Sequence, residues 1–276
     1  MGLIMFCFAS NSVITRYLVL GDRLSPFALT TVRFVSGLVM LFLLQKSIPQ
    51  RFQNVRPTKA NVLGGLLLGL YAFCISYGYV YISVAAGTLV FYGCVVIAMS
   101  LYSYLHDRDM VRIRPVLGQI LAFVGIVVIT FGKIQSVTSL GVALMACTGI
   151  SWGLYSVYGR GFKGSFGYTY NSFLIFGLSA LVLSPAVRAL SPASITFDLS
   201  LGGIGLALYM GMISTALSYV LWHKVLGRIS SSQGGVSQLI APIMSSVMGV
   251  LLLGEQVTSS LLLGGAAILV GIYFNT

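Results

Sequence analysis

Long apolar stretches that are almost free of charge rule out a soluble fold for this chain. One of them, at 228–255, reads RISSSQGGVSQLIAPIMSSVMGVLLLGE and contains an apolar run of bilayer-crossing length. Only 8% of the 276 residues are charged, whereas a soluble domain has about 25% charged residues. The mean hydropathy is +0.97, and the loops between the apolar stretches are short. The sequence therefore predicts an integral membrane protein without a soluble domain.

Ten of these stretches have about the 20 residues that a helix needs to cross a bilayer. We expect the spans at 2–20, 25–45, 59–81, 84–105, 114–132, 137–158, 168–189, 201–223, 231–253 and 259–274. The fold class predicted from this pattern is an all-α bundle of ten transmembrane helices.

The lysines and arginines are divided unevenly between the two sets of loops. Eleven of the 16 lie in the loops after even-numbered spans, four lie in the opposite loops, and Arg33 lies inside a span. Loops rich in these residues stay in the cytoplasm. We therefore expect a multi-pass protein of the cytoplasmic (inner) membrane with both termini in the cytoplasm. The same bias accounts for most of the net charge of +11 without a nucleic-acid partner.

The chain contains an internal repeat. VLGQILAFVGIVVI at 116–129 resembles LLGGAAILVGIYF at 262–274, which is an offset of 146 residues. Arg16 and Arg160, which are 144 residues apart, each close the first span of a copy. A repeat of this length is the signature of a duplicated structural unit.

The repeat divides the chain into two five-span halves, 1–133 and 134–276. Because five is an odd number, the second half must lie upside down relative to the first. Inverted repeats are typical of alternating-access transporters, whose substrate site lies near the middle of the membrane between the halves.

Several motifs resemble the ten-helix EamA-type members of the drug/metabolite transporter superfamily. They are WGLYSVYGRG at 152–161, APIMSSVMGVLLLGE at 241–255 and the paired glycines of spans five and ten. The resemblance covers essentially the whole chain. This sequence departs from the family pattern twice: FCFASNSV in span one lacks the usual tryptophan–glycine pair, and span four lacks a proline equivalent to Pro242.

The resemblance implies a central substrate pathway lined mainly by spans one, three, four, six, eight and nine. It also implies transport of small metabolites, often the export of amino acids or related amphipathic compounds. We therefore expect a transporter without a cofactor that acts in the lipid bilayer as a monomer or homodimer. No metal site is expected, because the four cysteines have no metal-ligand spacing.

Aromatic and polar residues inside the spans mark the predicted substrate site. A tyrosine hydroxyl in hydrocarbon needs a partner, and a cavity between helices supplies one. Gln238 precedes Pro242 by four residues, and a proline there should kink the helix and free a carbonyl for a wet or polar neighbour. The predicted substrate-binding residues are Asn11, Arg33, Tyr71, Tyr92, Trp152, Tyr155, Trp222, His223 and Gln238, with Pro242 as the kink or gate.

Arg33 is the only charged residue deep within a span. Ionisable residues at that depth are expensive and are often functional. Two interpretations stay open from sequence: Arg33 binds a substrate carboxylate, or it stabilises the bundle by bonding to carbonyls. No Asp or Glu lies in the middle of a span, which disfavours proton antiport through a buried carboxylate and leaves downhill facilitation or coupling through His223 open.

Two other functional classes fit parts of the sequence. GISWG at 149–153 matches G-x-S-x-G, so an intramembrane serine hydrolase or protease could use Ser151 and His223. That motif normally sits on a strand-to-helix turn, whereas here it falls inside a predicted helix. A membrane scaffold that transports nothing is the third class, and it would have no central cavity.

Overall fold

The computed structural model describes a bundle of helices. The described residues are 1–20, 24–47, 59–106, 113–131, 137–160, 162, 165–190, 201–238 and 240–274. Within them every extended element is helical, and strand-like pairing is limited to isolated bridge residues, such as the bridge between Ile82 and Val137. The all-α prediction is therefore confirmed for this part of the chain.

The helices follow one another closely along the chain. The first half contains α1 (Gly2–Leu20), α2 (Pro26–Gln45), α3 (Lys59–Tyr81), α4 (Val84–His106) and α5 (Ile113–Phe131). The second half contains α6 (Ser139–Arg160), α7 (Ser165–Leu190), α8 (Leu201–Tyr209), the π-helix η3 (Met210–Leu217), α9 (Ser218–Leu226), α10 (Ser231–Ser237), α11 (Ile240–Leu253) and α12 (Ser259–Tyr273).

Seven helical segments of the described chain are long and apolar enough to cross a membrane. Two shorter apolar segments, Phe166–Val182 and Ser259–Gly271, lie in α7 and α12. The chain is therefore a multi-pass membrane protein, and the full count of ten spans stays a prediction.

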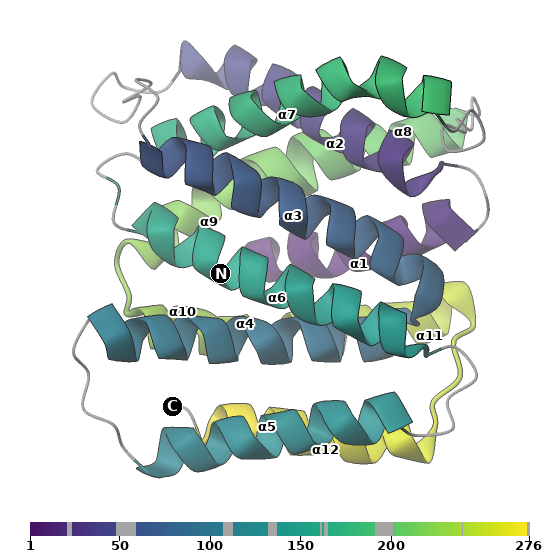
Figure 1. The fold of residues 1–276 in the computed structure, drawn as a ribbon, viewed down its shortest axis with the longest axis vertical. Coiled ribbons are helices and arrows are strands. Elements are labelled where there is room, and N and C mark those ends of the chain that lie inside the picture. Colours follow the sequence, from purple (N-terminus) through teal and green to yellow (C-terminus); the bar gives the residue numbers. More distant parts are fainter. Residues whose placement is uncertain are drawn as a thin grey trace.

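The helices lie side by side in layers (Figure 1). α5 and α12 pair at one edge, next to a layer formed by α4, α10 and α11. α2, α7 and α8 lie at the opposite edge. Between these layers run α1, α3, α6 and α9, with α6 packed against both α3 and α4. Helices from both halves of the chain therefore surround the centre of the bundle.

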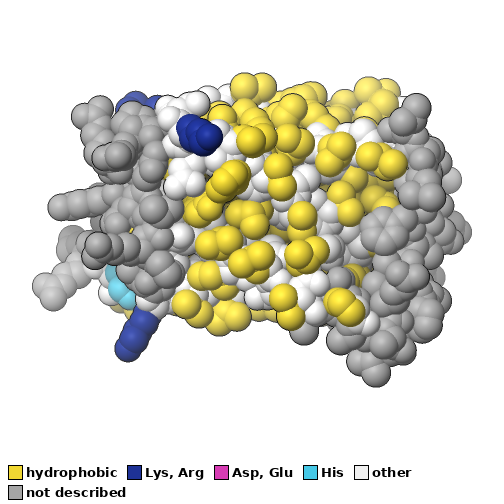
Figure 2. Space-filling model, turned by 90° about the horizontal axis from the view of Figure 1, so that it is seen from above, with side chains coloured by type: hydrophobic (Ala, Val, Ile, Leu, Met, Phe, Trp, Pro, Cys, Tyr) yellow, Lys and Arg dark blue, Asp and Glu magenta, His cyan; other side chains and the backbone are white. Residues whose placement is uncertain are grey.

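The surface has a hydrophobic middle and a basic end. Figure 2 shows hydrophobic side chains over the middle of one face and Lys and Arg side chains toward one end. The helix boundaries agree, because Lys46 follows α2, Lys59 begins α3 and Arg160 ends α6 at that end (Figure 1). An apolar belt with basic residues at one end fits a bilayer.

The eighth predicted span is not a uniform α-helix. Its middle, Met210–Leu217, is a π-helix, and the N–H of Ser218 donates to the carbonyl of Ile213, five residues earlier. A π segment inserts an extra residue into a helical turn and is frequent at functional sites. Here it carries Ser214 and Thr215, two of the polar residues that bond to the neighbouring helices.

The ninth predicted span is interrupted in the turn that precedes Pro242. α10 ends at Ser237 and α11 begins at Ile240, so the interruption precedes Pro242. Pro242 lies in the first turn of α11, where its missing N–H removes no intrahelical bond. The carbonyl of Gln238 accepts a hydrogen bond of 3.0 Å from the N–H of Ala241. The chain itself therefore supplies a partner for the carbonyl that Pro242 leaves free.

We expect Gly149→Val to destabilise the contact between α6 and α4. A Cβ at Gly149 would lie 2.6 Å from the Cβ of Cys94 and would also meet the backbone of Phe91, so neither helix can yield locally. Overpacking of this kind costs about 1–3 kcal/mol. Thermal unfolding of the purified protein in detergent measures it. Gly205→Val is the control, because a Cβ at Gly205 meets nothing within 4 Å. Equal losses in both variants would contradict the prediction.

Candidate functional site

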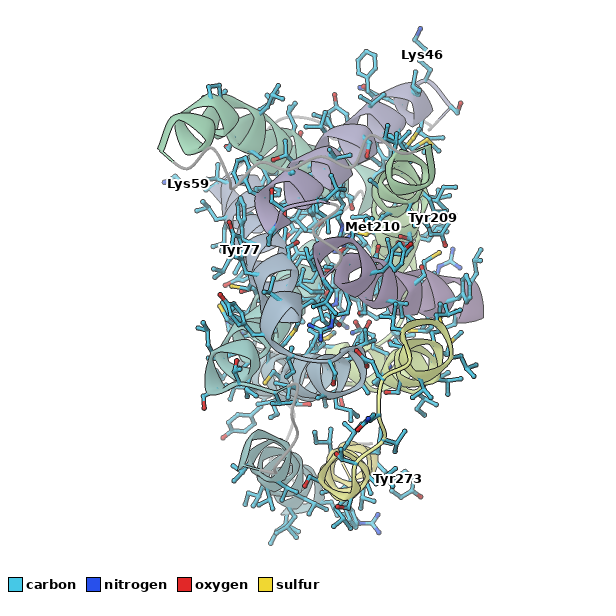
Figure 3. The ribbon with its side chains drawn as sticks, turned by 90° about the vertical axis from the view of Figure 1, so that its right-hand side faces the viewer. Lys46, Lys59, Tyr77, Tyr209, Met210 and Tyr273 are labelled. Carbon is cyan, nitrogen blue, oxygen red and sulfur yellow. The ribbon has the colours of Figure 1, made fainter. Side chains whose placement is uncertain are left out.

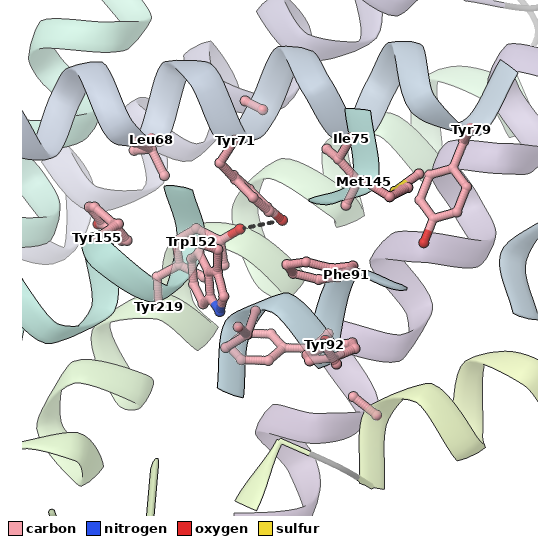
Figure 4. Close-up of a cluster of buried hydrophobic side chains, with 14 of the residues drawn as sticks. Leu68, Tyr71, Ile75, Tyr79, Phe91, Tyr92, Met145, Trp152, Tyr155 and Tyr219 are labelled. Carbon is pink, nitrogen blue, oxygen red and sulfur yellow. Dashed lines mark hydrogen bonds between the residues drawn. The ribbon is translucent and has the colours of Figure 1, made fainter. Parts of the chain in front are cut away.

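A small cavity lies at the centre of the bundle. Its wall is built from α1, α3, α4, α6 and α9, which include helices of both halves. The lining residues are Phe8, Asn11, Ser12, Tyr71, Ile75, Phe91, Tyr92, Trp152 and Tyr219. Figure 4 shows most of the aromatic members converging on this region.

The cavity is closed in this structure. Its cavity volume, measured as the space open to the centre of a water molecule, is only about 10 Å³. That is room for about one water. A metabolite can therefore enter only after the walls have moved apart.

Aromatic rings supply most of the cavity wall, with Trp152 in the middle of them. The Trp152 ring centroid lies 4.5 Å from that of Tyr219, 5.2 Å from that of Tyr71 and 5.4 Å from that of Phe8. All four side chains are buried. Such rings offer flat apolar faces with a few polar tips, which suits an amphipathic solute better than a bare ion.

Gln238 holds Trp152 in place from behind the wall. The indole N–H of Trp152 donates to Oε1 of Gln238 over 2.8 Å. The amide nitrogen of Gln238 donates in turn to the carbonyl of Gly234 over 3.4 Å and lies 3.6 Å from the sulfur of Met99. Gln238 is fully buried at the break between α10 and α11. One hydrogen bond thus connects that break to the centre of the cavity wall.

Arg33 is fully buried beside the cavity and bonds to hydroxyl groups. Its Nε donates to Oγ1 of Thr215 over 2.7 Å. Its Nη2 donates to the hydroxyls of Tyr219 and Tyr71 over 2.9 and 3.1 Å. These bonds include none of the carbonyl partners of the bundle-stabilising interpretation, and Arg33 reaches the cavity through its two tyrosines.

Asn11 fixes α1 against the π-helix. Its amide nitrogen donates to the carbonyl of Ser214 over 2.8 Å, and its Oδ1 accepts from the hydroxyl of Ser214 over 2.6 Å. Asn11 also lines the cavity. The π segment therefore contributes both the partner of Asn11 and, through Thr215, a partner of Arg33.

The other predicted site residues lie farther from the cavity. Tyr155 contacts Trp152 from outside the wall, with ring centroids 5.6 Å apart. Trp222 donates its indole N–H to Oγ of Ser156 over 3.1 Å. Pro242 faces an apolar groove between α4, α11 and α12. Of the predicted residues, the structure places Asn11, Tyr71, Tyr92 and Trp152 in the cavity wall.

Sequence reasoning did not select Phe8, Phe91 or Tyr219 as site residues. The position of Tyr219, three residues before Trp222 on one helical face, could have identified it. The two phenylalanines carry no such signal, because an apolar ring is equally suited to lipid or to a cavity. Not every tyrosine within a span points inward: Tyr77 and Tyr273 lie at the periphery of the bundle in Figure 3 and are 38% and 73% exposed.

The structure does not assemble a serine–histidine dyad. Ser151 lies inside α6. His223 pairs through Nδ1 with Oγ1 of Thr169 over 3.0 Å, and its Nε2 has no hydrogen-bond partner in the described chain. Neither nitrogen is bonded to Ser151. Nor do any three His, Cys, Asp or Glu side chains of the described residues cluster as metal ligands.

An ionic cluster ties several helices together at the end of the bundle away from Lys46 and Lys59. Gly254 has φ 66°, a left-handed conformation that glycine adopts freely, and it turns the chain after α11. Glu255 then accepts hydrogen bonds from the first N–H groups of α4, at Val84 over 2.7 Å and at the next residue over 3.2 Å. A carboxylate at a helix N-terminus is favourable.

Arg16 completes this cluster. Its Nε lies 3.8 Å from Oε1 of Glu255, and its Nη1 donates to the carbonyl of Tyr79 at the end of α3. The end of α11 is thereby joined to α1, α3 and α4, three helices that line the cavity.

Gln238→Leu should destabilise the protein, because it leaves the buried indole N–H of Trp152 without an acceptor. The expected cost is about 1–3 kcal/mol, measured as a lower thermal midpoint in detergent. Gln233→Leu is the matched control: Gln233 is exposed and only caps the N–H of Ser230, so its loss should cost about 0.5 kcal/mol or less. Equal midpoints for the two variants would argue against this role of Gln238.

Comparison with known proteins places the chain in a family. The model of the EamA-like transporter family matches residues 1–131 and again 139–276. An uncharacterized protein of Pseudomonas aeruginosa is 30% identical over 98% of this chain and 91% of its own length. A protein of Salmonella typhimurium named as a probable amino-acid metabolite efflux pump is 26% identical over 76% of each chain.

A solved crystal structure, similar at 18% identity, shares the fold. It covers 100% of this chain and 98% of its own, with a TM-score of 0.67. The fold, the membrane-length helices and the family match over nearly the whole sequence agree. The chain belongs to the EamA-like transporter family, and it is a membrane transporter.

Proposed function

We propose that the protein moves small amphipathic metabolites, such as amino acids or related compounds, across the cytoplasmic membrane by alternating access. The observation that carries this proposal is the closed aromatic cavity at the centre of the bundle. A closed central site is one state that an alternating-access cycle must contain. Asn11, Tyr71, Tyr92 and Trp152 would contact the substrate, and Gln238 would hold Trp152.

Export of amino acids is the favoured direction and substrate class. Its support is the Salmonella relative, whose name describes an amino-acid metabolite efflux pump. The cavity chemistry is compatible with this class, because an amino acid combines an apolar side chain with groups that need hydrogen bonds. No enzymatic step is required of any residue in the wall.

We further propose ten spans arranged as two inverted repeats, 1–133 and 134–276, with both termini in the cytoplasm. The separate family matches to 1–131 and 139–276 support the duplication. The basic end of the bundle supports the orientation. The cluster of Arg16 and Glu255 would then lie on the outer side.

In this orientation the Arg16–Glu255 cluster acts as an outer latch. A related contact lies at the basic end, where Nη1 of Arg160 donates to Oγ of Ser231 at the start of α10 over 3.0 Å. Arg160 is the repeat equivalent of Arg16. The acidic residues that follow α4, Asp107 and Asp109, are outside the described residues.

Glu255→Gln should weaken the outer latch and favour the outward-open state. The probe is Ser12→Cys, in the cavity wall, in a variant without the four native cysteines. Losing about 1 kcal/mol of ionic and helix-terminus stabilisation should speed its labelling by an external, impermeant maleimide roughly fivefold. Gln256→Ala, a change of the exposed next residue, is the control. Unchanged labelling in Glu255→Gln would contradict the latch.

The transport proposal is tested with purified protein in liposomes and a panel of labelled amino acids and related metabolites. Saturable uptake of at least one compound is expected. Trp152→Ala should reduce uptake at limiting substrate by a factor of a few to about ten, because the substrate loses an aromatic ring against which it stacks. Phe274→Ala, at an exposed aromatic residue near the end of α12, should change uptake little.

Two results would overturn the proposal. Absence of saturable uptake of every compound in the panel would favour the scaffold class. Normal uptake by both Trp152→Ala and Gln238→Ala at limiting substrate would place the substrate site elsewhere.

A further inference from the structure

A buried positive charge without a matching negative charge stands beside the cavity. Arg33 has no exposed surface, and its contacts are with neutral groups: it donates to three hydroxyls and lies over the rings of Phe34 and Tyr71. Glu255 is the only carboxylate side chain in the described part of the chain, and it bonds to Arg16 and α4 at the end of the bundle. Enclosed charges are normally paired, because an unpaired ion in a low-dielectric interior is costly. The anion that would balance Arg33 is therefore not supplied by these residues.

Arg33 also has unused hydrogen-bonding capacity. A guanidinium carries five N–H groups and accepts none. Three N–H groups are used, by Thr215, Tyr219 and Tyr71. Nη1 is buried and has no hydrogen-bond partner in the described residues.

Of the two tyrosine hydroxyls that bond to Arg33, one has an O–H without an acceptor among the described residues. Each phenol oxygen accepts from Nη2, and the hydroxyl of Tyr219 donates to that of Tyr71 over 2.9 Å (Figure 4). Because arginine cannot accept a hydrogen bond, two hydroxyls hold two protons but share only one bond. One O–H is therefore left without an acceptor among the described residues, whichever tyrosine donates to the other. Both tyrosines line the cavity.

We infer that this pair of tyrosines, polarised by Arg33 behind it, is the anion-recognition element of the substrate site. It selects a carboxylate attached to an apolar or aromatic body. The spare phenol O–H donates to the carboxylate, and the aromatic wall around Trp152 receives the body. Arg33 acts through the tyrosines as a positioning residue, since it does not itself line the cavity. Hydrogen bonds to an ionised acceptor are about twice as strong as neutral ones.

This inference rests on the proposed function and adds a charge preference to it. The test uses 3-phenylpropionate, its neutral amide 3-phenylpropionamide and the cationic phenethylamine as probes of nearly equal shape. The chain has two tryptophans, and Trp152 lines the cavity, so quenching of intrinsic fluorescence reports binding. Wild-type protein should bind the acid at least about tenfold more tightly than the amide, and the amine should bind no more tightly than the amide.

Hydroxyl deletions separate recognition from packing. Tyr71→Phe and Tyr219→Phe each leave one phenol O–H that can donate to the carboxylate. Each single variant should therefore keep most of the preference for the acid over the amide. The double variant has no O–H left and should bind acid and amide within about threefold of each other. Tyr209→Phe, which removes a half-buried hydroxyl near Ser10, is the control and should keep the wild-type ratio.

The ratio of acid to amide affinity decides the outcome, because a purely structural role of Arg33 would change stability without changing this ratio. A wild-type ratio below about threefold, or no quenching by 3-phenylpropionate at millimolar concentration, overturns the inference. An unchanged ratio in the double variant also overturns it. If the double variant does not fold, the wild-type ratio and the ratio for Arg33→Gln still test the inference. Arg33→Gln should abolish the preference for the acid over the amide. Saturable liposome uptake of a neutral or cationic metabolite, without a preference for acids, would support the transport proposal and contradict only the anion-recognition inference.

Discussion

Inside a bilayer a polar group has no water to bond to, and the arrangement of this bundle follows from that constraint. The chain meets it with local solutions. The carbonyl left free at the break in span nine is taken by the N–H of Ala241, and the π segment of span eight offers the Ser214 carbonyl to Asn11. In both of these irregular segments a carbonyl is thus paired with a group from its own or a neighbouring helix. Polar side chains therefore determine which helices meet there.

The apolar spans and the all-α class could be predicted, because a membrane leaves few alternatives to a helix of about 20 residues. Trp152, Tyr71 and Asn11 could be selected for a related reason: each carries a polar atom into an apolar span, and that atom must find a partner inside the bundle. Phe8 and Phe91 could not be found in this way, since neither side chain has a polar atom that would be penalised in lipid.

The level of a site residue along its helix was harder to predict than the type of residue that the site contains. Trp222 and His223 were grouped with the cavity residues because they are aromatic and lie in span eight, yet they bond to Ser156 and Thr169 outside its wall. The kink expected from Pro242 lies in the turn that precedes it, where the shorter helix α10 ends, but the sequence did not indicate which neighbouring side chain that turn would hold. Sequence periodicity gives the face of a helix but not the level at which a neighbouring helix crosses it.

The partners of Arg33 also constrain how the protein is made. Thr215 and Tyr219 lie 182 and 186 residues later in the chain, so span two enters the membrane long before they are synthesised. A lone arginine at the centre of a helix costs about 2.5–3.5 kcal/mol at insertion. The apolar run LVMLFLL at 38–44 offsets the insertion cost of Arg33 until the second half of the chain is synthesised. Biogenesis of this transporter thus includes a waiting period in which Tyr71 is the one partner of Arg33 already synthesised, and assembly with the second half adds Thr215 and Tyr219.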